Sequence, residues 1–239
     1  MALRPTAWYH GYMTTDRVPT PMAPAADRDP GQIGSDAFYA ALGRAFVVMC
    51  AVVPVLFGIE LIDNLSGGRL QRDGGIQPHV LHGLDGIVLA PFLHANFAHV
   101  TANSVPLILL GTFALAAGTR RFVLSTALIM VAGGLGVWLI GDPRTIVVGA
   151  SGVIFGYFGL LLVRGVVERS WWNIAVTLLI GLLYGWQLLG VLPGDPHVSW
   201  QGHLCGFVSG MIAGVVFRRR RPARPRASAA DGDTLLLPG

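Results

Sequence analysis

The chain has 239 residues, of which 53% are hydrophobic and only 13% are charged, and its mean hydropathy is +0.58. This balance excludes an ordinary water-soluble domain and is typical of a protein that spans a membrane. The formal net charge of +4 depends on 17 basic residues, all of them arginine.

The apolar residues form six blocks of 17 to 20 residues, separated by polar segments. A helix of this length crosses a hydrocarbon layer of about 30 Å. The expected spans are 44–62, 99–117, 122–140, 151–167, 171–190 and 199–217. We therefore predict an all-α fold, a polytopic membrane protein with a bundle of six transmembrane helices over residues 44–217.

Two tails and one long connection complete the expected organisation. Residues 1–43 hold five prolines before residue 36 and are expected to be a disordered N-terminal tail, since the first apolar block comes too late for a cleavable signal peptide. Residues 218–239 are expected to be a basic, disordered C-terminal tail. Segment 63–98 contains its own apolar patch, "IVLAPFL", and is expected to lie partly in the outer membrane interface.

The arginines indicate the orientation of the chain in the membrane. Fourteen fall before the first span, after the last, or in the connections on that same side, including Arg164 and Arg169 between spans four and five. Three fall on the other side: Arg69, Arg72 and Arg144. The positive-inside tendency then places both termini in the cytoplasm. The arginine-, alanine- and glycine-rich composition suggests a bacterial plasma membrane.

The basic tail "RRRRPARPRASAA" and a pI near 9.6 raise the question of nucleic acid binding. A basic run directly after a span is more typical of a topology signal or of contact with anionic lipid. We therefore expect the lipid bilayer, and no nucleic acid, as a partner.

Polar residues interrupt the first turns of spans two, four and six, which run in the same direction. Residues i and i+4 lie about 40° apart on a helix, so His99 and Asn103 share a face of span two. Span four begins with Ser151, between Gly149 and Gly152. Because these spans are parallel, their first turns lie at one depth, and the polar groups are expected to converge near the outer face.

Span six adds a histidine and a row of glycines. His203 lies about one turn into the span, and Gly206 and Gly210 follow it on the same stripe. Small residues let helices approach closely. We expect these glycines, with Gly149 and Gly152, to bring spans four and six together.

This set of residues has the chemistry of acyl transfer. A neutral imidazole can take the proton of a serine hydroxyl, so Ser151 is the candidate nucleophile and His203 its base. Spans two, four and six carry no Asp or Glu above their cytoplasmic ends, which favours a dyad over a triad. His99, Asn103 and the backbone N–H groups at the start of span four are the candidate donors to the developing oxyanion.

Each of these residues also has a purely structural interpretation. Serine beside glycine is common where helices touch, and a membrane-interface histidine or a lone asparagine can simply satisfy the local backbone. A metal site from His94, His99 and His203 is the chemical rival, but no HExxH motif or intramembrane carboxylate pair would complete it. We expect no metal and no cofactor. The cysteines, Cys50 and Cys205, are given no role.

With these residues assembled, the sequence resembles the rhomboid intramembrane serine proteases. The second-helix pattern is "HANFAHVTAN", the serine motif is "GASG", and the last-helix histidine is followed by spaced glycines. The resemblance implies that Ser151 and His203 cleave transmembrane protein substrates. It also implies that His99, Asn103 and the backbone N–H of Ser151 help to bind the oxyanion. It also implies a gate formed by span five and residues 190–199, and a structural role for His94 at the pocket edge.

Two features differ from many family members. Phe155 stands where a tyrosine often stacks on the histidine, and the first outer loop lacks a Trp-Arg pair. Two other functions stay open: a non-proteolytic relative that binds membrane proteins, and a small transporter or channel. Retention of both Ser151 and His203 argues against the first, and the confinement of polar residues to one leaflet argues against the second. No oligomeric state follows from the sequence.

Overall fold

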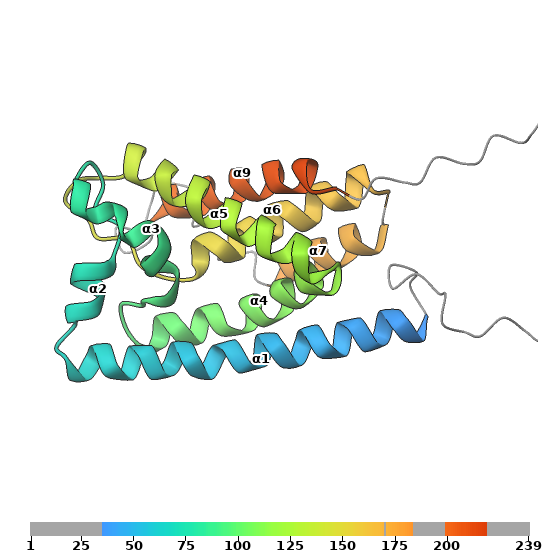
Figure 1. Ribbon diagram of the computed structural model, residues 1–239, viewed down its shortest axis with the longest axis horizontal. Helices are drawn as coiled ribbons and strands as arrows, with labels where there is room; N and C mark the ends of the chain where they lie inside the picture. The colour runs from blue at the N-terminus through green and yellow to red at the C-terminus, as the bar shows by residue number, and fades with distance from the viewer. Residues whose placement is uncertain (1–34, 170, 184–198, 219–239) are drawn as a thin grey trace, which may run out of the picture.

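The computed structural model describes residues 35–169, 171–183 and 199–218 (Figure 1). Within these ranges the chain is helical, and its sole β-type pairing is an isolated bridge between Ile76 and Val147. The longer helices are α1 (Asp36–Leu65), α4 (Phe97–Ala116), α5 (Thr119–Ile140), α6 (Ser151–Val167), α7 (Trp171–Leu183) and α9 (Trp200–Val216). The predicted all-α bundle is confirmed.

Three helices, α1, α4 and α5, are long and apolar enough to cross a membrane by length and composition, and α6 is a shorter apolar helix. The count of six spans stays a prediction. The helical structure of the second half of span five also stays a prediction, because residues 184–198 lie outside the described part of the chain. The expected tails lie largely outside it too, since residues 1–34 and 219–239 are not described. The expected gate residues, 190–199, are therefore described only at Ser199.

Helix α1 begins eight residues before the expected span 44–62. Ser35 caps its N-terminus, with the hydroxyl oxygen accepting a hydrogen bond from the Phe38 N–H at 3.1 Å, and Asp36 lies in the first turn. A capping hydroxyl and an acidic first turn both stabilise a helix start. Residues 36–43, expected in the N-terminal tail, are therefore helical.

Helix α6 packs against α4, α5, α7 and α9, while α1 lies along α4 on one side of the bundle (Figure 1). The core between these helices is aliphatic. Its most completely buried members include Val100, Leu110, Ala114, Ile129, Leu160 and Ala213. The start of α6 is thereby fixed against several neighbouring helices.

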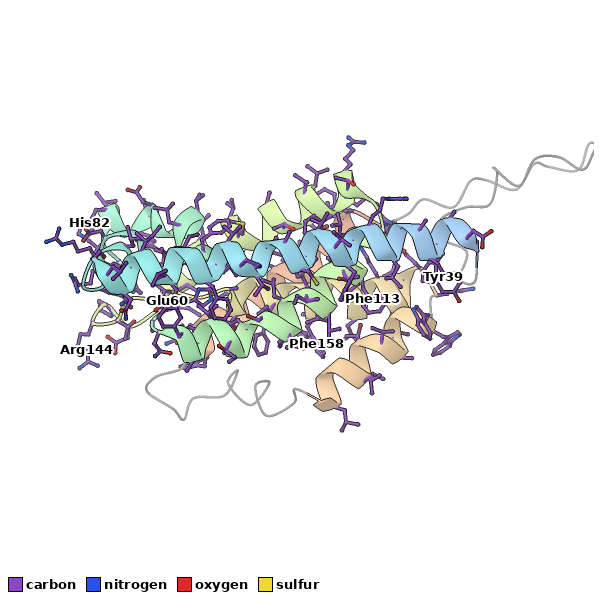
Figure 2. All side chains as sticks on the ribbon, turned by 90° about the horizontal axis from the view of Figure 1, so that it is seen from below. Tyr39, Glu60, His82, Phe113, Arg144 and Phe158 are labelled. Carbon is purple, nitrogen blue, oxygen red and sulfur yellow. The ribbon has the colours of Figure 1, made fainter. Side chains whose placement is uncertain are left out.

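Residues 66–96, here called the connecting segment, fold into short helices. These are α2 (Arg69–Gly74), η2 (Leu81–Leu84), α3 (Gly86–Leu89) and η3 (Ala90–Phe92), and both α3 and η2 pack against α5. Figure 2 shows His82 of this segment and Arg144 of the α5–α6 loop at the same end of the bundle, away from Tyr39. The placement of the connecting segment in the outer membrane interface stays a prediction.

Arg164 differs from its expected place in a connection between spans. It lies in the last turn of α6 with no exposed surface, and its guanidinium donates to the Ser125 hydroxyl of α5 at 3.1 Å. The reason is a tertiary contact: the acceptor, Ser125, lies on the neighbouring helix α5, and the distribution of charges along the chain does not reveal it. Arg164 is therefore a buried packing residue.

Candidate active site

The backbone before Ser151 passes directly beside two side chains of α4. Gly149 has φ +118°, and a Cβ there would lie 2.6 Å from His99 Cε1 and 2.8 Å from His99 Nε2. It would also lie 3.7 Å from the amide nitrogen of Asn103. Only glycine fits this conformation and this space. The structure thus places His99 and Asn103 against the loop that leads into Ser151.

The amide nitrogen of Asn103 is buried without a hydrogen-bond acceptor among the described residues. The side chain is 5% exposed. Leaving a buried donor unpaired costs stability, so such a group calls for a functional or structural reason. Asn103 is available to donate to a group bound next to Gly149.

His94 lies immediately before α4 and contacts the same loop. Its Nε2 accepts a hydrogen bond from the Ala150 N–H at 3.3 Å, and its ring meets the His99 ring edge-on at 5.1 Å. Burial, with a smaller contribution from His99, lowers the pKa of His94 from 6.5 to about 4, although a backbone hydrogen bond with Phe92 opposes the shift. The neutral ring is the form that can accept from Ala150.

His203 reaches the first turns of α6 from α9. Its ring stacks on that of Phe155, with centroids 4.2 Å apart and planes inclined by 14°. Phe155 lies one turn after Ser151, on the same side of α6. His203 therefore packs against α6 one turn after Ser151.

The glycines of α9 bring its backbone onto that of α6. A Cβ on Gly206 would overlap the Gly152 carbonyl oxygen, and one on Gly210 would overlap that of Gly156. A Cβ on Gly152 would stand 3.4 Å from the Gly202 carbonyl oxygen. Since His203 and Gly206 are three residues apart, the close approach also turns His203 toward α6.

A pocket with an empty volume of about 470 Å³, including the space at its mouth, opens beside Ser151. Its walls come from α5, α6, α9 and the connecting segment, and are mostly apolar. Residues lining it include Ile76, Ile129, Val137, Gly149, Ser151, Gly152, Ser199, Gly202 and Gly206. Among the described residues, no group of three His, Cys, Asp or Glu side chains is arranged to hold a metal ion.

Two further contacts shape this region, and only one of them left a signal in the sequence. The Ala90 carbonyl accepts from the Gly149 N–H at 2.9 Å, and Ser199 caps α9 by accepting from the Gly202 N–H at 3.2 Å. The first is a backbone contact that any residue type could make. The second is a typical N-cap serine, recognisable from its position just before an apolar helix.

Comparison with known proteins places these features in context. The family model described as Rhomboid domain matches residues 82–220. The chain is 44% identical over 195 residues to the uncharacterized protein Rv1337 of Mycobacterium tuberculosis, covering 77% of this chain and 81% of the relative. It is 41% identical over 175 residues to the uncharacterized protein ML1171 of Mycobacterium leprae, covering 70% of this chain and 69% of the relative.

Proposed function

Because this chain belongs to the rhomboid family, whose members are generally intramembrane serine proteases, we propose that it is a serine endopeptidase acting through a Ser151–His203 dyad. Its substrates are transmembrane proteins, cut near the membrane face where α6 begins. The observation that carries the proposal is that His203 stacks on Phe155 one turn after Ser151, while His99 and Asn103 lie beside Gly149, two residues before it.

In this mechanism His203 takes the proton of the Ser151 hydroxyl as the oxygen attacks the substrate carbonyl carbon. The stack of His203 on Phe155, one turn after Ser151, supports this role for the imidazole. When the tetrahedral intermediate collapses, the protonated imidazole donates its proton to the leaving amine, and the acyl group stays on Ser151 as an ester. In the second half of the reaction His203 takes a proton from the attacking water and returns it to the serine oxygen as the acid product leaves. The hydrogen bond between Ser151 and His203 that this step needs is expected to tighten as the substrate binds.

The developing oxyanion is stabilised by donors at the start of α6. No side chain caps this helix, so the N–H groups of its first turn, including that of Ser151, point outward at the positive end of the helix dipole. The unpaired amide of Asn103 and the ring of His99 complete the donor set. Preorganised donors of this kind supply a large part of the rate in acyl transfer.

The protein is an integral membrane protein. We extend this to a multi-pass protein of a bacterial plasma membrane with both termini in the cytoplasm, supported by the arginine distribution and by its mycobacterial relatives. In that orientation α6 begins at the outer face, and the candidate residues lie below the outer headgroups.

The test uses purified full-length protein in liposomes with a transmembrane test substrate. Wild type is expected to cleave it, and Ser151→Ala and His203→Ala are each expected to abolish cleavage. His82→Ala, which changes an exposed histidine of the connecting segment, is the matched control and should cleave normally. Undiminished cleavage by Ser151→Ala would overturn the serine mechanism.

A further inference from the structure

Trp138, near the C-terminal end of α5, is bonded to the connecting segment at two points. Its indole N–H donates to the Val80 carbonyl at 2.9 Å, and its backbone carbonyl accepts from the His79 N–H at 3.1 Å. The His79 and Trp138 rings stack with centroids 6.3 Å apart. The His79 ring also contacts the Gly141 carbonyl through Nε2 at 3.2 Å.

The backbone of His79 is held in an uncommon conformation. Its φ is +64°, in the left-handed region that residues other than glycine rarely adopt. Such a conformation persists where surrounding contacts determine it. Here those contacts are made with Trp138 and Gly141, so they fix the course of the connecting segment at this point.

The connecting segment, which includes His94, in turn holds the loop that precedes Ser151. Ile76 and Val147 exchange both backbone hydrogen bonds, at 3.0 and 2.9 Å. The Gly149 N–H donates to the Ala90 carbonyl at 2.9 Å, and the Ala150 N–H donates to His94 at 3.3 Å. Three backbone N–H groups within four residues of Ser151 are thus bound to residues 76–94.

We infer that Trp138 and His79 are positioning residues for Ser151, acting through the connecting segment to hold the serine loop in its reactive geometry. This inference rests on the proposed function. Neither residue lines the pocket beside Ser151. Loosening their contacts releases residues 76–80, then the bridge to Val147, and finally the backbone that places the nucleophile.

Two variants test each side of the contact. Trp138→Phe keeps an aromatic ring against His79 but removes the donor to Val80. His79→Asn removes the imidazole, while asparagine tolerates the left-handed backbone. The control is Tyr39→Phe, which likewise removes the hydrogen-bonding group of an aromatic side chain, at a 60% exposed tyrosine near the start of α1.

The first measurement is the rate of labelling of the full-length protein by a small fluorophosphonate, which reacts with an activated serine without requiring a protein substrate. Both variants are expected to label roughly five- to tenfold more slowly than wild type, the effect of losing about one hydrogen bond. Tyr39→Phe should label at the wild-type rate. Wild-type rates in both test variants would overturn the inference.

The second measurement, hydrogen exchange of peptides covering residues 145–151, is independent of activity. Both variants are expected to exchange faster there, with α4 and α5 unchanged. Equal acceleration through every helix would mean general destabilisation and would overturn the positioning role. If wild type fails to label, the proposed function fails, and the exchange at 145–151 alone decides whether Trp138 and His79 hold the loop.

Discussion

The ring of Phe155 lies nearly parallel to the imidazole of His203, with centroids 4.2 Å apart. This contact joins α6 to α9 one helical turn after Ser151. Because His203 is 8% exposed, the stacked ring forms one wall of its surroundings and restricts its orientation. An aromatic contact of this kind contributes about 0.5–1.5 kcal/mol beyond burial.

Replacing Phe155 by leucine is expected to lower kcat/KM for a transmembrane test substrate by roughly two- to tenfold, because the imidazole loses the face that orients it. Phe155→Tyr keeps the ring and should retain most of the activity. The control is Phe158→Leu, since Phe158 packs on Phe207 across the same pair of helices at 5.9 Å. Equal loss in Phe155→Leu and Phe158→Leu would mean that only helix packing was disturbed.

Alanine at Gly206 or Gly210 is expected to destabilise the bundle by about 1–3 kcal/mol, because each new methyl group meets a backbone carbonyl of α6 that cannot move aside. The measurement is the midpoint of thermal unfolding in detergent. Gly58→Ala is the control: nothing lies within 4 Å of a Cβ at Gly58 of α1, and alanine favours a helix. Midpoints unchanged in both α9 variants would contradict the packing described.

The helical elements were largely predictable because apolar blocks bounded by polar residues leave a clear pattern. The expected spans 151–167 and 199–217 correspond to α6 (Ser151–Val167) and α9 (Trp200–Val216). The grouping of His99 and Asn103 beside the serine loop followed from helical spacing and a shared depth. These are local properties, and a single sequence contains them.

Contacts between distant segments were not predictable in the same way. The connecting segment lacks a Trp-Arg pair, and nothing in the sequence indicated that Trp138 of α5 would donate to the Val80 carbonyl of this segment. Backbone acceptors such as the Ala90 carbonyl carry no residue signature. The burial of Arg164 depends on Ser125 of another helix, so neither charge nor hydropathy along the chain reveals it.

Acid is expected to destabilise the protein through His94, between pH 6.5 and about 4. The folded-state pKa of His94, about 4, lies below its ordinary value of 6.5, so the unfolded chain binds the proton more tightly. The stabilisation is therefore complete above pH 6.5 and is lost as the pH falls through 4, by at most about 3 kcal/mol. Thermal unfolding from pH 7 to pH 4.5 measures it.

His94→Gln is the matched variant for this pH series. The glutamine amide can still accept a hydrogen bond from the Ala150 N–H, but it does not titrate. Its unfolding midpoint should therefore fall less steeply with acid than that of wild type. Parallel pH profiles for the two proteins would show that other groups cause the acid sensitivity.

Arg121 joins the ends of three helices at the opposite end of the bundle from the serine. Its Nη2 donates to the Glu168 carboxylate just after α6, and its Nε donates to the Phe217 carbonyl just after α9 at 2.8 Å. The Arg121 and Glu168 side chains are only 19% and 16% exposed. Water therefore screens this pair far less than an ordinary surface pair.

Glu168→Gln is expected to lower the free energy of unfolding by about 1–3 kcal/mol, because it leaves the guanidinium charge partly buried without its carboxylate. A double-mutant cycle with Arg121→Gln, measured by thermal unfolding, isolates the pair from other contacts. Asp142→Asn is the control, since it breaks an exposed pair with Arg144 and should change the midpoint little. A coupling energy of zero between Arg121 and Glu168 would mean that the carbonyl of Phe217, and not the ion pair, holds Arg121 in place.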